Sequence, residues 1–179
     1  MGFLPKNYET PAGSSNFFKL EEGDNRFRIM SEAVVGWEGW KDNKPFRRKG
    51  VEKNIEDNEV DIDQKFSKKP KINHFWAFIV WDYEAKVLKM FTLTQKTIMK
   101  AIDGLVNDED WGDPKNYDIS IEKTVKGQRT TYSVKAYPPK KVAKELSDAM
   151  RDTELDVEDV FRETDDEEEV KADKKFKNF

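Results

Sequence analysis

The chain has 179 residues, which is enough for one domain with a hydrophobic core but short for two full-sized domains. It contains no cysteine and a single histidine, His74, which excludes disulfides, thiol nucleophiles, cysteine-rich zinc sites and most histidine-based metal cages. No apolar run approaches the roughly 20 residues that span a bilayer, and residues 1–20 lack the pattern of a signal peptide. We therefore expect a soluble cytoplasmic protein with no membrane attachment.

The net charge of −4 is distributed unevenly along the chain. Lys and Arg exceed Asp and Glu by 2 through Met150, whereas Asp and Glu exceed Lys and Arg by 6 from Arg151 to Phe179. The acidic residues are therefore concentrated at the C-terminal end, and the part before them is nearly neutral. We predict an N-terminal arm over residues 1–24, a folded domain over residues 25–150 and an acidic C-terminal tail over residues 151–179.

The expected elements begin with an irregular arm that ends near Gly23-Asp24. Alternation of apolar and polar residues predicts a first strand from Asn25 to Trp37. Residues 41–71 are polar, charged and almost without apolar periodicity, which predicts a long mobile loop. The elements expected after this loop are a β-hairpin over residues 74–83 and 86–94, an amphipathic helix over 95–107, a second hairpin over 117–123 and 129–137, and a short helix beginning near Lys140.

This order of elements matches the five-stranded OB barrel, which carries its helix between strands three and four. SH3-like barrels and other small β-barrels share parts of the same order. The sequence therefore predicts a mainly β fold: an OB-type barrel with one or two helices, a long loop after strand one and a disordered acidic C-terminal tail.

Residues 74–83 carry large side chains on both alternating faces. One face would hold Phe75, Ala77, Ile79, Trp81 and Tyr83, and the other His74, Trp76, Phe78, Val80 and Asp82. A barrel strand has one interior face, so the second set is either covered by the N-terminal arm or the long loop, or exposed. Exposed aromatic rings flanked by cations are suited to stacking on unpaired bases, a contact that tolerates any base sequence.

The candidate nucleic-acid-binding residues combine aromatic rings with nearby cations, as stacking and backbone neutralisation require. Arg26 and Arg28 share one side of strand one and would contact phosphates or stack beside a base; the alternative is a solvated face that pairs with carboxylates. Residues 65–71 contain no acid and have the composition to close over a bound strand. The predicted set is Arg26, Arg28, Trp37, Trp40, Lys41, Lys44, Phe46, Arg47, Arg48, Lys49, Lys69, Lys71, Trp76, Phe78, Trp81 and Tyr83.

The tail contains five consecutive acids, which resist folding. A tethered anion has a high effective concentration at a cation-lined groove and would compete there with nucleic acid. Once displaced, the acids and the terminal aromatic residue would be available to protein partners. The predicted partner-binding residues are Asp165, Asp166, Glu167, Glu168, Glu169 and Phe179. The alternative is a solubilising tail without specific contacts.

A catalytic centre is not expected. The acids Asp108, Glu109, Asp110 and Asp113 lie in a Trp-Gly-Asp-Pro turn and are more simply capping residues than metal ligands. The acids between Asp57 and Asp63 do not fit a calcium loop, because Ile62 stands where that loop needs glycine. Glycine-rich phosphate loops and Ser-His-Asp arrangements are absent. We therefore expect a non-enzymatic protein with no cofactor and no metal.

Four blocks of sequence carry a family resemblance: FFKLEEGDNRFRIM, GWEGW followed by KPFRRK, KPKINHFWAFIVWDYEAKVLKMFTLTQKTI, and DWGDPKNYDISI. Together they make the segment from Phe17 to Lys140 resemble phage-encoded single-stranded DNA-binding proteins of OB fold. The resemblance implies a barrel that coats single-stranded DNA during replication or recombination in an infected bacterium. It also implies an acidic tail whose terminal aromatic residue docks on polymerase-like partners. This chain departs from that pattern in the Lys-rich stretch before Phe179.

Three functions remain open on the sequence. The first is sequence-tolerant coating of single-stranded DNA, the second is an RNA-binding or RNA-chaperone OB protein, and the third is a replisome scaffold whose main ligand is protein. Stacking and phosphate contacts serve either polymer, and selection for RNA needs contacts to the 2′-hydroxyl that a sequence does not reveal.

Overall fold

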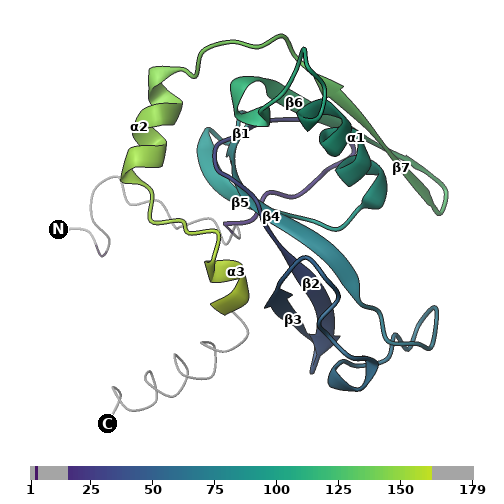
Figure 1. Ribbon diagram of the computed structural model, residues 1–179. Coiled ribbons are helices and arrows are strands. Elements are labelled where there is room, and N and C mark those ends of the chain that lie inside the picture. Colours follow the sequence, from purple (N-terminus) through teal and green to yellow (C-terminus); the bar gives the residue numbers. More distant parts are fainter. Residues whose placement is uncertain (1–2, 4–15, 163–179) are drawn as a thin grey trace.

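The computed structural model describes residues 3 and 16–162 of the chain. Its strands are β1 (Gly23–Ile29), β2 (Val34–Lys41), β3 (Lys44–Lys49), β4 (Asn73–Asp82), β5 (Val87–Leu93), β6 (Asp118–Lys126) and β7 (Arg129–Ala136). The helices are α1 (Lys96–Val106), α2 (Lys144–Asp152) and α3 (Asp159–Arg162), with 3-10 turns at Asp57–Glu59 and Pro114–Asn116. All strand pairs are antiparallel and form one sheet in the order β3-β2-β4-β1-β6-β7, with β5 paired to β4 (Figure 1). The prediction of a mainly β fold is confirmed.

The predicted first strand is two strands, β1 and β2, separated by residues 30–33. β1 lies between β6 and the end of β4, with Arg28 opposite both Asp118 and Trp81. β2 pairs with the beginning of β4, where Val35 lies opposite Trp76. Both strands therefore use the same partner, and the β2–β3 hairpin projects from the rest of the molecule (Figure 1).

The sheet does not close on itself among the described residues, because β5 and β7 are not paired. The segment 16–20 occupies the space between them. The backbone N–H of Phe18 donates to Met90 O at 2.7 Å, and the N–H of Met90 donates to Asn16 O at 2.7 Å. Leu20 accepts a hydrogen bond from Lys123 Nζ at 3.4 Å and packs in the same apolar cluster as Tyr132 of β7. An N-terminal segment thus bridges the opening.

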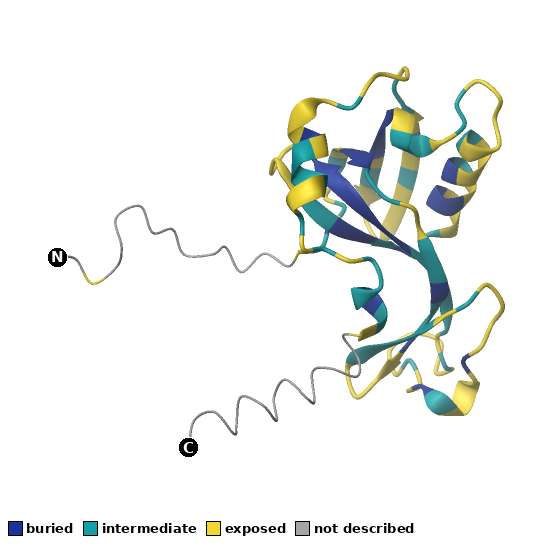
Figure 2. Cartoon of the chain, turned by 60° about the vertical axis from the view of Figure 1, so that its left-hand side comes forward, coloured by how far each residue is buried: buried dark blue, intermediate teal, exposed yellow. Residues whose placement is uncertain are grey.

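Two apolar clusters lie on opposite sides of β4. Phe78 and Val80 belong to the larger cluster, together with Phe27, Phe91 and residues of α1, β6 and β7. Phe75, Ala77 and Ile79 belong to the smaller one, with Met90 and Val160. Figure 2 shows the buried positions concentrated along the sheet. The reading in which both faces of this strand are buried is therefore confirmed for its central residues.

The cover of the second face comes chiefly from the C-terminal side of the chain. Val160 is buried, and the Phe161 ring lies 5.7 Å from the Phe75 ring, tilted by 50°. Met150, Leu155 and Val157 pack beside them. α2 and α3 follow one another along one side of the molecule toward the β2–β3 hairpin (Figure 1). The packed structure thus continues past the predicted domain boundary at residue 150, while the proposed acidic partner site from Asp165 to Glu169 and Phe179 lies outside the described residues.

The prediction of one long loop over residues 41–71 is wrong in its first part. β3 lies there and pairs with β2 through a two-residue turn, Asp42-Asn43, with φ values of 52° and 63°. Positive φ at both positions is the geometry of the type I′ hairpin turn, which Asp and Asn tolerate well. Beyond β3, Ile55 and Val60 are buried. The sequence did not predict this strand, because apolar and polar residues do not alternate in KPFRRK.

No helix in residues 16–162 is long and apolar enough to cross a membrane.

Candidate nucleic-acid interface

The predicted binding residues gather at the two ends of β4 rather than in one site. Trp37, Trp40, Phe46 and the cations of β2 and β3 lie at the beginning of β4, beside Trp76. Arg26, Arg28, Trp81 and Tyr83 lie at its end, where β1 pairs with β4 on one side and with β6 on the other. His74 and Asp82 are eight positions apart in β4, which corresponds to about 27 Å in an extended strand.

The strand register brings one set of these side chains onto a single surface. Residues directly opposite each other in an antiparallel pair share a face. Trp37 lies opposite both Arg48 and His74, Val35 opposite Trp76, and Lys41 opposite Lys44. We call this surface the hairpin face. It comprises Val35, Trp37, Lys41, Lys44, Phe46, Arg48, His74 and Trp76.

Aromatic rings and cations alternate on the hairpin face. The Trp37 and His74 rings lie 4.9 Å apart, and the guanidinium of Arg48 is 5.0 Å from the centre of the Phe46 ring. Lys41 Nζ is 6.0 Å from the same ring. The two cation-to-ring distances are in the cation–π range, and Trp37, Phe46 and Trp76 are partly buried. Flat apolar surfaces next to positive charges are what stacking on a base and contact with its phosphate require.

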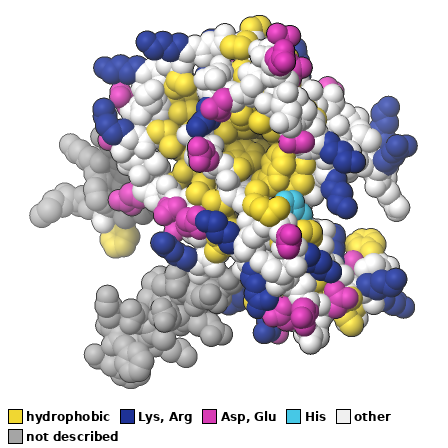
Figure 3. Space-filling model, viewed as in Figure 1, with side chains coloured by type: hydrophobic (Ala, Val, Ile, Leu, Met, Phe, Trp, Pro, Cys, Tyr) yellow, Lys and Arg dark blue, Asp and Glu magenta, His cyan; other side chains and the backbone are white. Residues whose placement is uncertain are grey.

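An apolar groove of about 570 Å³ extends this surface past Trp76. Its lining includes Val35, Phe78 and Ile102 of α1, and Figure 3 shows hydrophobic side chains gathered in the middle of the molecular face in view. The rim carries Glu32, Asp103 and Asp113, together with Lys115, whose Nζ is 3.7 Å from Asp113. A groove with this lining suits a flat apolar group such as a base, whereas the cations suited to phosphate lie on the hairpin.

The loop after β3 crosses part of the hairpin face. Trp37 Nε1 donates to Val51 O at 3.2 Å, and Gly39 has no room for a Cβ beneath Val60. Glu59 accepts two hydrogen bonds from Arg48, at 2.6 and 2.8 Å. The hydrogen bonds from Arg48 lower the pKa of Glu59, which keeps this carboxylate charged. The loop thus supplies an acid to a cation that the sequence assigned to phosphate.

The opposite face of the β2–β3 hairpin contacts the C-terminal segment. Arg47 donates to Glu38 Oε1 at 2.9 Å and to Val160 O at 3.4 Å, and its side chain is only 8% exposed. Lys49 Nζ is 2.5 Å from Glu158. The predicted phosphate contact of Arg47 is therefore corrected to a structural one. Trp40, also on this side, is 46% exposed.

Three further predicted contacts are buried and are corrected in the same way. Phe78 and Trp81 are 2% and 4% exposed, so neither can stack on a base without rearrangement. Arg28 is 1% exposed and donates to the carbonyl oxygens of Lys115 and Lys140 at 3.0 and 2.8 Å. Alternation showed correctly that Arg26 and Arg28 share a side, but not that the second arginine is enclosed. Lys69 and Lys71 are exposed on the segment that leads into β4.

At the far end of β4, several groups converge on the buried carboxylate of Asp118. Arg26 Nη2 lies 2.8 Å, Arg28 Nη1 3.4 Å and Lys140 Nζ 3.4 Å from its oxygens. Tyr83 Oη donates to Asp118 Oδ1 at 2.7 Å. We call these five residues the Asp118 cluster.

Burial would raise the pKa of Asp118, but hydrogen bonds from Tyr83 and Arg26 and the charge of Lys140 outweigh it, so the pKa lies below its ordinary value. Burial and the hydrogen bond to Asp118 raise the pKa of Tyr83 to about 12. The cluster therefore holds a carboxylate anion and a neutral phenol at pH 7.

Sequence reasoning missed Asp118, Tyr137 and the binding potential of His74. Asp118 begins the alternating run of β6, and Tyr137 follows the last residue of β7, positions that alternation assigns to strands without a role. His74 Nδ1 is buried and has no hydrogen-bond partner within the described part of the chain. An unmet polar atom beside Trp37 is the kind of group that a ligand can satisfy.

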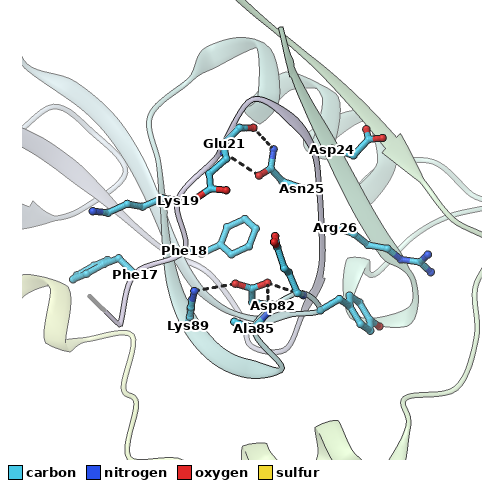
Figure 4. A pocket seen from close by; sticks show the side chains of 12 residues that line it. Phe17, Phe18, Lys19, Glu21, Asp24, Asn25, Arg26, Asp82, Ala85 and Lys89 are labelled. Atoms are coloured by element: carbon cyan, nitrogen blue, oxygen red, sulfur yellow. Dashed lines mark hydrogen bonds and ion pairs between the residues drawn. The ribbon is translucent and has the colours of Figure 1, made fainter. Parts of the chain in front are cut away.

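A second cavity, of about 560 Å³, lies between the N-terminal segment and the β4–β5 turn (Figure 4). Two sets of its polar groups contact each other: Lys89 Nζ is 2.9 Å from Asp82, and Asn25 exchanges hydrogen bonds with the backbone of Glu21. Figure 4 shows Phe18 pointing into this cavity and Arg26 extending away from it. Arg26 lines this cavity, but its guanidinium is directed to Asp118.

Within residues 16–162, no group of three or more His, Asp or Glu side chains is arranged to hold a metal ion. Comparisons with models of protein families, with curated proteins and with solved structures find no match to this chain.

Proposed function

We propose that this chain binds single-stranded DNA, largely without sequence preference and without catalysing a reaction. The observation that carries the proposal is the hairpin face, where Trp37, Phe46 and Trp76 lie among Lys41, Lys44 and Arg48. In the proposed complex, bases stack on the rings while the lysines neutralise phosphates, with Lys69 and Lys71 contributing from the neighbouring loop. Such contacts recognise a single strand without depending on its base sequence.

We further propose that the sheet is a variant of the OB barrel. Its connectivity supports this: a bent first strand contacts both β4 and β6, the β4–β5 hairpin follows, and α1 precedes the β6–β7 hairpin. In this variant the segment 16–20 takes the place of the pairing between β5 and β7. OB barrels commonly bind oligonucleotides on an open face of this kind.

The biological role that fits these contacts is coating of single strands during replication or recombination, in the cytoplasm of a phage-infected bacterium. Recruitment of a polymerase-like partner through Asp165 to Glu169 and Phe179 remains part of the proposal. The RNA-binding and scaffold alternatives differ from it in their ligands, so one binding experiment separates them.

The test measures quenching of tryptophan fluorescence during titration with matched DNA and RNA oligonucleotides, for the wild type and for Trp37→Leu and Trp76→Leu. Each substitution should weaken DNA binding by about 5- to 150-fold, equivalent to about 1–3 kcal/mol per stacked base. Trp111→Phe is the matched control, because Trp111 packs edge-on against Tyr117, at 5.3 Å, outside the hairpin face. This control should bind like the wild type.

The alternatives predict different outcomes. Quenching by RNA that exceeds quenching by DNA would support the RNA-binding alternative. Absence of quenching and of binding with either polymer would reject the proposal and leave the scaffold. Equal loss of affinity in Trp111→Phe would indicate damage to the fold rather than to the site.

A further inference from the structure

A second surface with the same chemistry lies on the outer side of β1, β6 and β7. The register places Arg26 opposite Ser120, and Ser120 opposite Lys135. Tyr137 follows on the same side, with its N–H donating to Asp118 O at 3.0 Å. These side chains point away from the core, because the alternate residues Phe27, Ile119 and Ile121 are fully buried.

Arg26 is fixed in position on this surface. Its Nε and Nη2 donate to Asp118 Oδ2 at 3.2 and 2.8 Å, and its guanidinium carbon lies 3.9 Å from the centre of the Tyr137 ring. The side chain is nevertheless 41% exposed, and the two hydrogen bonds leave Nη1 for another acceptor. A guanidinium held in place before binding loses little entropy when it meets a phosphate.

The charges around Arg26 are not balanced. Arg26, Arg28 and Lys140 all contact the single carboxylate of Asp118, and Lys135 Nζ lies 5.1 Å from the Tyr137 ring. The carboxylates nearest along the same face are Asp24 and Glu122, which form the next pair of the β1–β6 register. Arg28 and Asp118 are buried, and the exposed cations Arg26, Lys135 and Lys140 exceed the exposed carboxylates Asp24 and Glu122 by one.

Ser120 gives an independent indication of a ligand. Its side chain lies between Arg26 and Lys135 in the register and is 3% exposed, and its hydroxyl has no hydrogen-bond partner among the described residues. Buried hydroxyls in proteins are usually hydrogen-bonded. A phosphate oxygen between the two cations would supply the missing partner once the side chains that enclose Ser120 Oγ move aside.

We infer that Arg26, Lys135, Tyr137 and Lys140 form a second binding site for the phosphodiester backbone of a single-stranded nucleic acid. The inference rests on the proposed function and adds a second point of contact to it. The site lies at the opposite end of β4 from the hairpin face, about 27 Å along an extended strand, and on the other face of the sheet, because Arg28 lies opposite Trp81 whereas Trp37 lies opposite His74. A long oligonucleotide therefore reaches both sites, and a short one bound at the hairpin face does not.

The experiment compares the double variant Lys135→Gln, Lys140→Gln with the wild type. Affinity for oligothymidylates of about 6 and about 30 nucleotides is measured at several NaCl concentrations. For single strands, log K falls with log salt by roughly 0.7 for each phosphate contact, so loss of two contacts should reduce the slope by roughly 1.4 for the long oligonucleotide. The slope for the short oligonucleotide should not change.

The matched control is Lys96→Gln, Lys100→Gln, which removes two exposed charges from α1, away from this surface. It should leave both slopes close to those of the wild type. Arg26 stays in place in the test variant, and Asp118 keeps its contacts with Arg26 and Arg28, so thermal unfolding should show an intact fold. Photo-crosslinking with 5-iododeoxyuridine in the long oligonucleotide should give adducts on the peptide that contains Tyr137.

Failure of this inference is distinguishable from failure of the proposed function. An unchanged slope with the long oligonucleotide, with crosslinks confined to Trp37 and Trp76, would overturn the second site and leave the hairpin face intact. No binding of either oligonucleotide by the wild type would overturn both. Equal loss in the α1 control would show a general charge effect and would also overturn the second site.

Discussion

The two ends of β4 carry the same kinds of residue in opposite arrangements. At the Asp118 cluster, two arginines and a lysine share one buried carboxylate. At the hairpin, each cation with a carboxylate partner has its own: Arg47 pairs with Glu38, Arg48 with Glu59 and Lys49 with Glu158. The first arrangement ties strands together around a buried charge. In the second, the Arg48 and Lys49 pairs are partly exposed, whereas the Arg47 pair is nearly buried. Residue type alone does not distinguish structural from binding cations, but the exposed fraction of each side chain does.

Among the proposed substitutions, Asp118→Asn should lower the free energy of unfolding the most. It removes the carboxylate that compensates the buried guanidinium of Arg28, and breaking a buried ion pair in this way costs about 3–5 kcal/mol. Urea unfolding monitored by circular dichroism measures the loss. The same experiment on Glu59→Gln should show a much smaller change, because the Arg48–Glu59 pair is partly exposed. Equal losses for the two variants would remove the distinction between the ends.

Lowering the pH should remove the contribution of Asp118 to the stability of the folded protein. Its pKa in the folded protein lies below the ordinary value of about 3.9, so the unfolded state takes up a proton first as the pH falls. The stabilisation is complete well above pH 4 and is lost as the pH falls through the folded-state pKa. The difference in unfolding free energy between wild type and Asp118→Asn should therefore be largest near neutral pH and shrink below about pH 4. A difference that grows on acidification would reject the assigned direction of the pKa shift.

The smallest expected effect concerns the acidic loop over the hairpin face. Glu59→Gln removes the charge that pairs with Arg48 and should tighten single-stranded DNA binding severalfold, most clearly at low salt. Asp57→Asn is the matched control, since Asp57 lies in the same loop and, within residues 16–162, pairs only with Lys53, at 3.7 Å, where both side chains are exposed. A similar gain from both variants would reflect loss of net negative charge and not release of Arg48.

Apolar periodicity predicted the strands and the helix in which apolar residues recur at regular short spacing. The helix expected over residues 95–107 is found as α1 over 96–106. The β4–β5 and β6–β7 hairpins lie close to their expected positions. β3 was not predicted because Phe46 and its cations share one face while Pro45 and Arg47 occupy the other, which leaves no apolar stripe. The turn residues Asp42 and Asn43 were the available signal.

The binding site was harder to predict because accessibility depends on distant segments. Alternation placed Trp76 and Trp81 on opposite faces of β4, but the burial of each depends on what covers that face. One face is closed in part by Val160 and Phe161, about 80 residues later in the chain. The pairing of Arg28 with Asp118, 90 residues away, likewise depends on strand register that no local pattern encodes.

The hydrogen bonds between the segment 16–18 and Met90 also bear on how copies of the chain meet one another. A sheet edge with unpaired N–H and C=O groups is a template for addition of a strand from another molecule, and natural proteins cover or interrupt such edges. At Met90, the edge of β5 is already occupied by the chain's own Phe18 and Asn16. The outer strand β3 contains Pro45, which has no N–H to donate, and four charged residues. Both features oppose edge-to-edge aggregation. The proposed function requires aromatic rings that are accessible to a ligand, so protection of the sheet edges matters for this protein.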